Sequence, residues 1–532
     1  MKNFLLPLLL IIFSSCSYFI SKVDESSPVK SPNEQKFSLI FSHNISGETH
    51  PCGCRNFPLG GLPQVAGLFA NISKDSEILY VDTGDTFFPS SVVPQTMHDS
   101  LTFAAQNLAL GLEQVGLKYF VPGDQDFAMG IEFLQGIANT RKFEFLIANL
   151  KDPTLIKHKD FVVIERNKSK IFLIGLVDPE VFNGPHADYF LSPAAALPGV
   201  LSEVARSGYE KGNPYHRLVV LSHAGIDPDE ALAKKFPEID WIVGAHSQSF
   251  LRYSKDEGNT KMVQVLSKNH YMGDIKIDVN SKKQTDTYEI HEVRDELERN
   301  LNPNPMRSFI DDHKAKMNDL QIKEQSKMGM SETLAAEIHK GVKKFKPAVS
   351  CLECHKPQTE FWQKTPHSIA YTTLINANES NNLSCIGCHS IGLNDPKGYT
   401  TQKNMVTFKN KPALDYWREV KKLGSHVESV RKLPPQEIQK ISVKWFALDK
   451  KAGVVNNFAN VQCLNCHAQG DMHPKKSDDD EVKLAAKDRE FNIKNKCLSC
   501  HTQDQSPEWY DSGIKVNNKF DESYKKMSCP SL

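Results

Sequence analysis

The stretch Cys463-Leu464-Asn465-Cys466-His467 carries the pattern Cys-x-x-Cys-His, which occurs four times in the last third of the chain. This spacing lets two cysteine thioethers hold the vinyl groups of one haem while the adjacent imidazole binds its iron. The pattern therefore predicts four covalently attached haem c groups, with His467 and its counterparts as proximal ligands. The other three copies are Cys351-Leu352-Glu353-Cys354-His355, Cys385-Ile386-Gly387-Cys388-His389 and Cys497-Leu498-Ser499-Cys500-His501.

Zinc binding and disulfide formation are the alternatives for paired cysteines, and Cys-x-x-Cys alone would leave them open. A histidine directly after every pair, repeated four times, favours haem. The other cysteines of the 12 are Cys16, Cys52, Cys54 and Cys529, which are too few for a disulfide framework. We therefore expect haems and an ordinary apolar core to hold the fold.

The charge balance excludes one class of partner. The 532 residues include 64 basic and 64 acidic side chains, so the formal net charge is zero. No overall field then attracts nucleic acid, and we expect no nucleic-acid partner. The length suits roughly two to four domains with ordinary cores.

The N-terminus has the composition of an export signal. Met1-Lys2-Asn3 is followed by an apolar run from Phe4 to Phe13, too short to span a bilayer, and then by Ser14-Ser15-Cys16. This order predicts a lipoprotein signal over residues 1–16, with Cys16 lipidated, although an aromatic residue at position 13 is unusual there. A plain secretory signal or an uncleaved anchor are the alternatives. We expect a membrane-anchored protein of the periplasm or cell envelope, where covalent haem attachment takes place.

The rest of the chain divides by composition. Residues 17–36 are polar and suit a flexible tether. Residues 37–292 alternate short apolar runs with amphipathic stretches such as 101–115 and 195–205, which predicts an α/β layered domain. Residues 293–345 carry many charges and predict a helical linker, and residues 346–532 predict a mainly helical, loop-rich multihaem domain. The predicted strands are 37–41, 78–82, 119–121, 143–148, 171–176, 218–221, 241–243, 262–266 and 274–279.

Each haem iron also needs a sixth ligand or keeps an open face. Outside the four motifs the last 200 or so residues contain few histidines, and four of them are candidates for four irons: His339, His367, His426 and His473. His313 and Met472 are substitutes. Two histidine ligands saturate the iron and suit electron relay, whereas one five-coordinate haem would permit chemistry on small molecules.

The haem region resembles a known family. The segment from Trp362 to Ala370 with His367, the sequences around the second and third motifs, and Ser506-Pro507-Glu508 after the fourth are similar to the tetrahaem cytochrome c family. The best-known member of that family accepts electrons from hydroxylamine oxidoreductase. The resemblance covers residues 346–532. It implies that His367 is a distal ligand and that one haem of the four can be five-coordinate.

Polar clusters follow several predicted strands of the α/β domain, where an open α/β sheet places its active site. Their order resembles the metallophosphatase domain of 5'-nucleotidases and UDP-sugar hydrolases, in which two metal ions activate water against phosphate. The resemblance implies metal ligands at Asp85, Asp124, His223 and His246, a set that suits zinc, manganese or iron. Asn44 and Ser46 stand where the family has aspartate and histidine, and Gln125 replaces a charge-stabilising histidine. We therefore expect at most one divalent metal ion and weak or no phosphoester hydrolysis.

A second unusual feature lies after the first strand, where Cys52-Gly53-Cys54 precedes Leu59-Gly60-Gly61-Leu62. Two thiols around a glycine can form a disulfide, hold a soft metal or exchange electrons. The segment looks like that of nucleotidase relatives which carry cysteine or selenocysteine here and accompany redox proteins. Cys52 and Cys54 are therefore candidate redox-active residues.

Together these features predict an exported, lipid-anchored electron carrier whose donor and acceptor are other redox proteins. An oxidoreductase that uses an open-faced haem or the Cys52/Cys54 pair is the alternative. A metal-dependent hydrolase of the 5'-nucleotidase type is a second, less favoured alternative.

Overall fold

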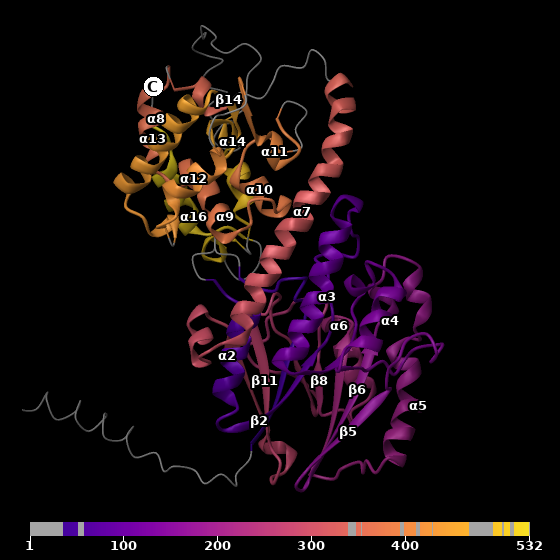
Figure 1. Ribbon diagram of the computed structural model, residues 1–532. Helices are drawn as coiled ribbons and strands as arrows, with labels where there is room; N and C mark the ends of the chain where they lie inside the picture. The colour runs from indigo at the N-terminus through magenta and orange to yellow at the C-terminus, as the bar shows by residue number, and fades with distance from the viewer. Residues whose placement is uncertain are drawn as a thin grey trace, which may run out of the picture.

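The computed structural model describes residues 36–51, 58–338, 347–352, 354–393, 398–410, 415–427, 429–467, 493–502, 505–510 and 515–530. Six predicted functional residues lie outside these ranges, and their roles stay predictions: Cys16, Cys52, Cys54, His339, Met472 and His473. The described part contains an α/β body and a smaller helical body beside it (Figure 1). Among the described helices none is both long and apolar enough to cross a bilayer.

The first sheet of the α/β body has six strands in the order β12-β11-β1-β2-β3-β4. The four strands from β1 to β4 are parallel, and β11 and β12 add antiparallel strands to the β1 edge. β1 is buried at every position after Lys36, as expected for a parallel strand covered on both faces. The bounds are β1 (Lys36–Ser42), β2 (Ser76–Asp82), β3 (Leu117–Phe120), β4 (Glu144–Phe145), β11 (Tyr271–Asp278) and β12 (Thr287–Glu292).

The second sheet also has six strands, in the order β5-β6-β7-β8-β10-β9. Its centre, from β6 to β10, is parallel, and β5 and β9 are antiparallel edge strands. The bounds are β5 (Phe161–Arg166), β6 (Ser169–Val177), β7 (His216–His223), β8 (Trp241–Val243), β9 (Lys255–Glu257) and β10 (Thr260–Val263).

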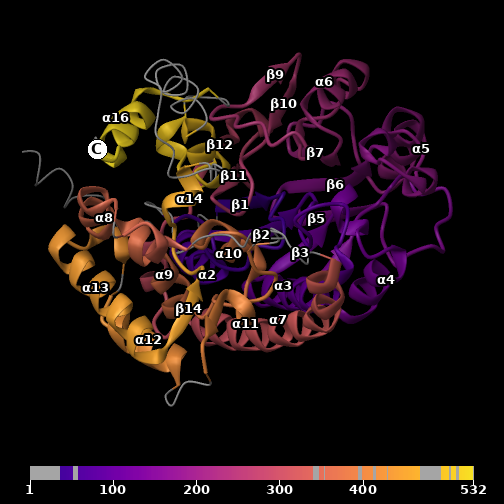
Figure 2. The same cartoon turned by 90° about the horizontal axis from the view of Figure 1, so that it is seen from above.

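The two sheets face each other with helices outside both, which makes a four-layer sandwich (Figure 2). Leu39 and Phe41 of the first sheet share one buried cluster with Leu173 and Val219 of the second. A second cluster lies between the other face of β6 and β7 and helices α5 and α6. The helices of this body are α2 (Leu62–Ile72), α3 (His98–Val115), α4 (Ile131–Thr140), α5 (Pro193–Arg206), α6 (Ile226–Lys235) and α7 (Pro305–Ile338).

The predicted linker is built into this sandwich. The 3-10 helix η6 (Asp295–Asn300) packs against α2, where Gln64 donates hydrogen bonds to Asp295 and Glu298. Helix α7 packs along α3, and Glu324 accepts a hydrogen bond from the backbone N–H of Ser100. The segment therefore belongs to the α/β body and also reaches the helical body, which α7 borders in Figure 1.

The helical body is made of short helices joined by long loops. Its core contains Tyr371, Ile386 and Trp445, which bring together helices α9, α10 and α13. A two-stranded antiparallel sheet, β13 (Val406–Phe408) with β14 (Val454–Asn457), lies between them. The helices are α8 (Lys356–Gln363), α9 (Ala370–Ala377), α10 (Leu383–His389), α11 (Gln402–Met405), α12 (Tyr416–Gly424), α13 (Pro435–Ala452), α14 (Cys463–Cys466), α16 (Asn518–Met527) and residues 493–500.

The predicted fold class, an α/β layered domain followed by a mainly helical one, is confirmed. Five of the described strands were not predicted: β5, β9, β12, β13 and β14. β9 and β12 are edge strands with mostly polar, partly exposed residues, so they lack the continuous apolar run that identified the central strands. β5 does have such a run, from Phe161 to Ile164, and the prediction missed it. β13 and β14 have only three and four residues.

Candidate functional site

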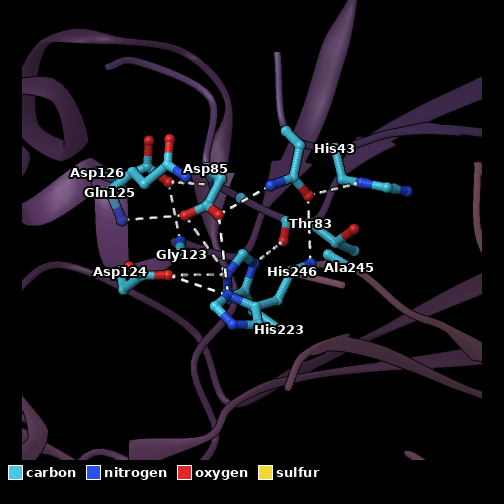
Figure 3. Close-up of polar contacts among 12 residues, drawn as sticks. His43, Thr83, Asp85, Gly123, Asp124, Gln125, Asp126, His223, Ala245 and His246 are labelled. Carbon is cyan, nitrogen blue, oxygen red and sulfur yellow. Dashed lines mark hydrogen bonds and ion pairs between the residues drawn. The ribbon is translucent and has the colours of Figure 1, made fainter. Parts of the chain in front are cut away.

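The predicted metal ligands of the α/β body come together. Asp85 follows β2, Asp124 follows β3, His223 ends β7, and His246 follows β8. Because these strands run parallel within each sheet, their carboxyl ends meet at one edge of the sandwich. One ligand atom from each of the four side chains lies within 4.8 Å of the others. Figure 3 shows the two carboxylates and two imidazoles pointing toward one another.

The distances in this cluster suit a metal ion. His223 Nε2 lies 3.4 Å from Asp85 Oδ1 and 3.5 Å from Asp124 Oδ1, and His246 Nδ1 lies 3.2 Å from Asp124 Oδ1. Ligand atoms bound tetrahedrally at about 2.1 Å are separated by about 3.4 Å. His223 is fully buried and its Nδ1 is held by the carbonyl oxygen of Thr83 at 2.6 Å. Its Nε2 has no well-formed hydrogen bond within the described residues, so the donor set fits one divalent ion.

The charges of the cluster also favour the binding of one divalent cation. Burial would raise the pKa of Asp124, but the adjacent imidazoles of His223 and His246 outweigh it and hold the pKa below its usual range. Burial would likewise lower the pKa of His223, but the carboxylates of Asp85 and Asp124 hold it well above its usual value. Without a metal ion, a proton on His223 therefore balances the carboxylates. A divalent cation would replace that proton.

Asn44 lies beside the metal cluster. His43 Nδ1 donates to Asn44 Oδ1 at 2.8 Å, because His43 Nε2 accepts a hydrogen bond from the backbone N–H of Val265 at 3.1 Å. Burial lowers the pKa of His43 to about 4, which keeps the imidazole neutral for this role. The amide of Asn44 is thereby oriented with Nδ2 toward Asp85 Oδ2, 2.9 Å away. Asn44 thus offers Asp85 an N–H donor and no additional negative charge for a metal ion.

The backbone of the site is strained. Asn44, Asp85 and His246 have φ values of 49°, 57° and 67°, in the left-handed region that costs a residue with a side chain free energy. Gly123 is needed for close packing, since a Cβ there would lie 2.4 Å from both Asp85 Oδ1 and His223 Cε1. Such strain is usual where a fold orients side chains for function.

Asp126 supports the site and was not recognised in the sequence. Its carboxylate accepts hydrogen bonds from the backbone N–H groups of Asp85, Thr86, Phe87 and Gly123 at 2.8–2.9 Å. It thus fixes the loops after β2 and β3 to each other. The only sequence signal was its place two residues after Asp124, on the strand-end cluster. Gln125 donates its backbone N–H to Asp85 Oδ1 at 3.0 Å.

The haem motifs also meet in space, in two pairs. The side chains of Cys388 and Cys500, from the second and fourth motifs, lie in hydrogen-bonding contact. The side chains of Cys351 and Cys463, from the first and third motifs, are also in hydrogen-bonding contact. Cys529 lies near the third motif, where it affects Cys463 and Cys466 electrostatically. Cys466 is also affected by the charges of Cys497 and Cys500, which brings the third motif close to the fourth and so joins the two pairs.

Two motif histidines present the nitrogen that an iron ligand needs. His389 Nδ1 lies 2.7 Å from the carbonyl oxygen of Ala370, and His501 Nδ1 lies 2.9 Å from Ser506 Oγ. A partner on Nδ1 fixes the ring and leaves Nε2 for a metal. These residues fit haem binding through Nε2.

His367 lies beside His501, with ring centroids 6.2 Å apart and ring planes inclined at 58°. The fold therefore places a second imidazole next to the fourth motif, where His367 could serve as a ligand of a bound haem. His426 is placed differently, with 57% of its side chain exposed and Nε2 3.9 Å from Glu437. His313 is buried against Phe103 of α3 and lies next to His50, with ring centroids 6.2 Å apart.

Fold and site define a chain of two parts, a metallophosphatase-like α/β domain and a cytochrome c-like helical region. Residues 350–411 match the family described as "Cytochrome c554 and c-prime", a match that spans the first two haem motifs. The α/β part is 26% identical to 5'-nucleotidase of Diplobatis ommata over 198 residues, which cover 35% of this chain and 32% of that protein. It is 21% identical to 5'-nucleotidase of Mus musculus over 266 residues, 44% of each chain. The chain thus spans less than half of these relatives.

Two solved structures resemble the same part of the chain. The 5'-nucleotidase precursor from Thermus thermophilus has 18% identity and a TM-score of 0.40, and the match covers 49% of this chain and 55% of that one. The sulfate thiohydrolase SoxB, also from Thermus thermophilus, has 17% identity and a TM-score of 0.44, with coverage of 55% and 62%.

Proposed function

We propose that this chain is an exported, lipid-anchored c-type cytochrome that carries four haems and transfers electrons between redox proteins. The observation that carries the proposal is the meeting of the four Cys-x-x-Cys-His motifs in one body, with His367 beside His501. A bound haem iron would alternate between the ferric and ferrous states and so carry one electron. The protein would supply the ligands of the iron, orient the haems and provide a path for electrons between them.

The pairing of motifs supports a relay. Contacts between the first and third motifs and between the second and fourth bring their attachment sites together. Electrons could then pass from haem to haem without leaving the helical body. His389 and His501, held through Nδ1, keep their Nε2 atoms fixed on the iron side while the charge of the iron changes.

Reduction of the purified full-length protein with dithionite tests this proposal. We expect low-spin c-type absorption bands and four haem iron transitions per chain in a redox titration. Carbon monoxide should leave the spectrum largely unchanged if every iron has two protein ligands. High-spin bands or one carbon monoxide-binding haem would instead favour an oxidoreductase with an open-faced haem.

Metal-dependent hydrolysis is a second candidate, favoured by the cluster of Asp85, Asp124, His223 and His246 and by the likeness to 5'-nucleotidases. A metal ion there would act as a Lewis acid toward a phosphate oxygen. However, Asn44, Ser46 and Gln125 stand where the resembled phosphatase pattern has an aspartate and two histidines, so ligands for a second ion and a charge-stabilising group are missing. We expect no phosphate release from a panel of nucleotides. Release that a chelator and Asp85→Ala both abolish would establish the hydrolase.

A redox role of Cys52 and Cys54 is the third candidate. It is favoured by His50, two residues before Cys52, whose side chain contacts Glu379 of the helical body. A redox titration that follows haem absorbance together with thiol labelling tests it. Thiols that change state over the range where the haems titrate would support a shared redox function. Thiols that stay in one state would leave the α/β domain as a docking module.

Lipid anchoring rests on the N-terminal sequence. A Cys16→Ser variant should appear in the soluble periplasmic fraction, whereas the natural sequence should follow the membranes. Equal partition of the two would contradict the lipoprotein assignment.

A further inference from the structure

A polar junction joins the α/β body to the second haem motif. His50, in the loop after β1, places Nε2 3.2 Å from Oε1 of Glu379, which follows α9 in the helical body. The two side chains are only 20% and 16% exposed. His50 is held from behind by Thr49, whose Oγ1 lies 2.9 Å from His50 Nδ1. The contact between His50 and Glu379 connects positions 329 residues apart in the sequence.

Glu379 is tied directly to the helix that carries the second motif. Asn382 donates from Nδ2 to Glu379 Oε2 at 2.9 Å, and its Oδ1 accepts the backbone N–H of Ser384 at 3.0 Å. Asn382 is thus the N-cap of α10, the helix that contains Cys385, Cys388 and His389. Burial, and next the negative charge of Glu379, raise the pKa of the Cys385 thiol to about 12. The carboxylate therefore acts electrostatically at the attachment site of this haem.

Helix α7 completes the junction. Gln325 donates to the carbonyl oxygen of Asn381 at 2.6 Å and accepts the backbone N–H of Gln402 at 2.8 Å. Asn318 accepts a hydrogen bond from Asn381 Nδ2 at 2.7 Å. These bonds join α7, which is packed on α3, to the segment between Glu379 and the second motif. The position of Glu379 is therefore fixed from both bodies.

The junction keeps Glu379 ionised. Burial would raise its pKa, but the hydrogen bond and charge of His50, the hydrogen bond of Asn382 and the charge of Lys314 outweigh it, so the pKa lies below its usual value. His313 also faces this group from α7, with ring centroids of His50 and His313 6.2 Å apart. Burial, with a smaller contribution from His50, lowers the pKa of His313 to about 4, so it is neutral.

We propose that the haem attached at Cys385 and Cys388 is the one that faces the α/β domain, and that Glu379 is a positioning residue which lowers its reduction potential. The inference rests on the proposed function, because it needs a haem at the second motif. Reduction adds one electron to the ferric iron, breaks no bond and needs no proton. A fixed anion nearby favours the ferric state, since it stabilises the more positive iron. The potential of this haem then depends on the docking of the two bodies.

A redox titration of the full-length protein with dithionite as reductant tests the inference. In Glu379→Gln one of the four transitions should move to higher potential and the other three should stay in place. The transition that moves should be the one that His389→Met also moves, which assigns it to the second motif. Glu379→Asp keeps the charge and should restore the natural value. The matched control is Glu419→Gln, which removes an exposed carboxylate on α12 and should leave all four transitions unchanged.

His50→Gln on the α/β side gives a second readout that does not depend on the folding of Glu379→Gln. It should move the same transition and no other. Unchanged potentials in Glu379→Gln and His50→Gln, or an equal shift of all four transitions, would overturn the inference. Failure of the proposed function is recognised separately, because peptide mass mapping would then show unmodified Cys385 and Cys388.

Discussion

At the scale of single residues, Asn44 decides what the α/β site can hold. Its amide is oriented by the neutral imidazole of His43, and its Nδ2 donates to Asp85. An aspartate at this position would place a second negative charge in the same contact. Asn44 is one of three positions, with Ser46 and Gln125, at which the sequence departs from the phosphatase pattern, and a substitution at Asn44 tests the account.

Asn44→Asp should destabilise the metal-free protein and make its stability depend more on metal. Two buried carboxylates would face each other at the present 2.9 Å contact, and the lost hydrogen bond alone costs about 1–3 kcal/mol. Thermal unfolding in the presence of a chelator and then of Mn²⁺ measures this. The exposed substitution Asn71→Asp on α2 serves as the control. Equal unfolding temperatures of Asn44→Asp and the natural protein in chelator would refute the assignment.

His223→Asn should weaken binding of Zn²⁺ or Mn²⁺ by about 100-fold or more, because even a residue behind a metal ligand contributes a factor of about 10–100. Isothermal titration calorimetry on the metal-depleted protein measures the affinity. His158→Asn, at a histidine paired with Asp160 elsewhere in the α/β body, should have no effect. The site would be excluded if His223→Asn bound metal as tightly as the natural chain.

At the scale of elements, α7 has a larger role than a linker. It packs on α3, and Gln325 binds the loop before the second motif and the start of α11. Replacing Gln325 by Ala should loosen the junction by about 1–3 kcal/mol, because two part-buried hydrogen bonds to backbone groups are lost, each of which contributes about 0.5–1.5 kcal/mol. Hydrogen exchange around residues 379–386 should then quicken. Ser326→Ala on the neighbouring exposed position of α7 is the control, and identical exchange in both variants would refute the role of Gln325.

Asp449 joins three elements of the helical body and gives it a pH dependence. Its oxygens accept hydrogen bonds from Tyr416 of α12 and Asn457 of β14 at 2.5 and 2.9 Å. Burial raises its pKa from 3.8 to about 6, even against these bonds. The folded state therefore holds a proton that the unfolded state releases above pH 4.

Because the folded protein binds more protons in this window, its stability should fall as the pH rises from about 4 to about 6. The protonated carboxyl of Asp449 contributes about 1–3 kcal/mol to the free energy of unfolding near pH 4, and this contribution is lost as the pH rises to about 6. Asp449→Asn stays neutral and should flatten this part of the stability profile, measured by circular dichroism. The exposed Asp521→Asn should not change the profile. A steeper fall in Asp449→Asn than in the natural protein would contradict the assignment.

The sequence predicted the central strands and the metal ligands but not the hydrogen bonds between loops. The central strands could be predicted, because buried parallel strands are continuous apolar runs. The set of Asp85, Asp124, His223 and His246 was predicted from the order of polar clusters at the strand ends, which resembles the metallophosphatase domain. The orientation of Asn44 and the role of Asp126 could not, since both depend on hydrogen bonds between loops that only the fold brings together. The contact of His50 with Glu379 is likewise tertiary, and nothing local in either segment indicates it.

At the scale of the whole molecule, a metallophosphatase-like sandwich and a haem region share one junction. The sandwich holds its four-ligand cluster at the carboxyl ends of its strands, and the loop that follows β1 leads from Asn44 at this cluster to His50 at the junction. His50 is six positions after Asn44, so their Cα atoms are at most about 22 Å apart. The metal cluster and the second haem motif therefore lie on the same side of the α/β domain.

The account depends most on the haem content of the chain. Intact-protein mass spectrometry after extraction of non-covalent haem, together with a pyridine haemochrome assay, measures it directly. We predict four covalently bound haems per chain and no unmodified Cys-x-x-Cys-His peptide. A chain with fewer haems, or with zinc bound to free motif thiols, would contradict the central claim.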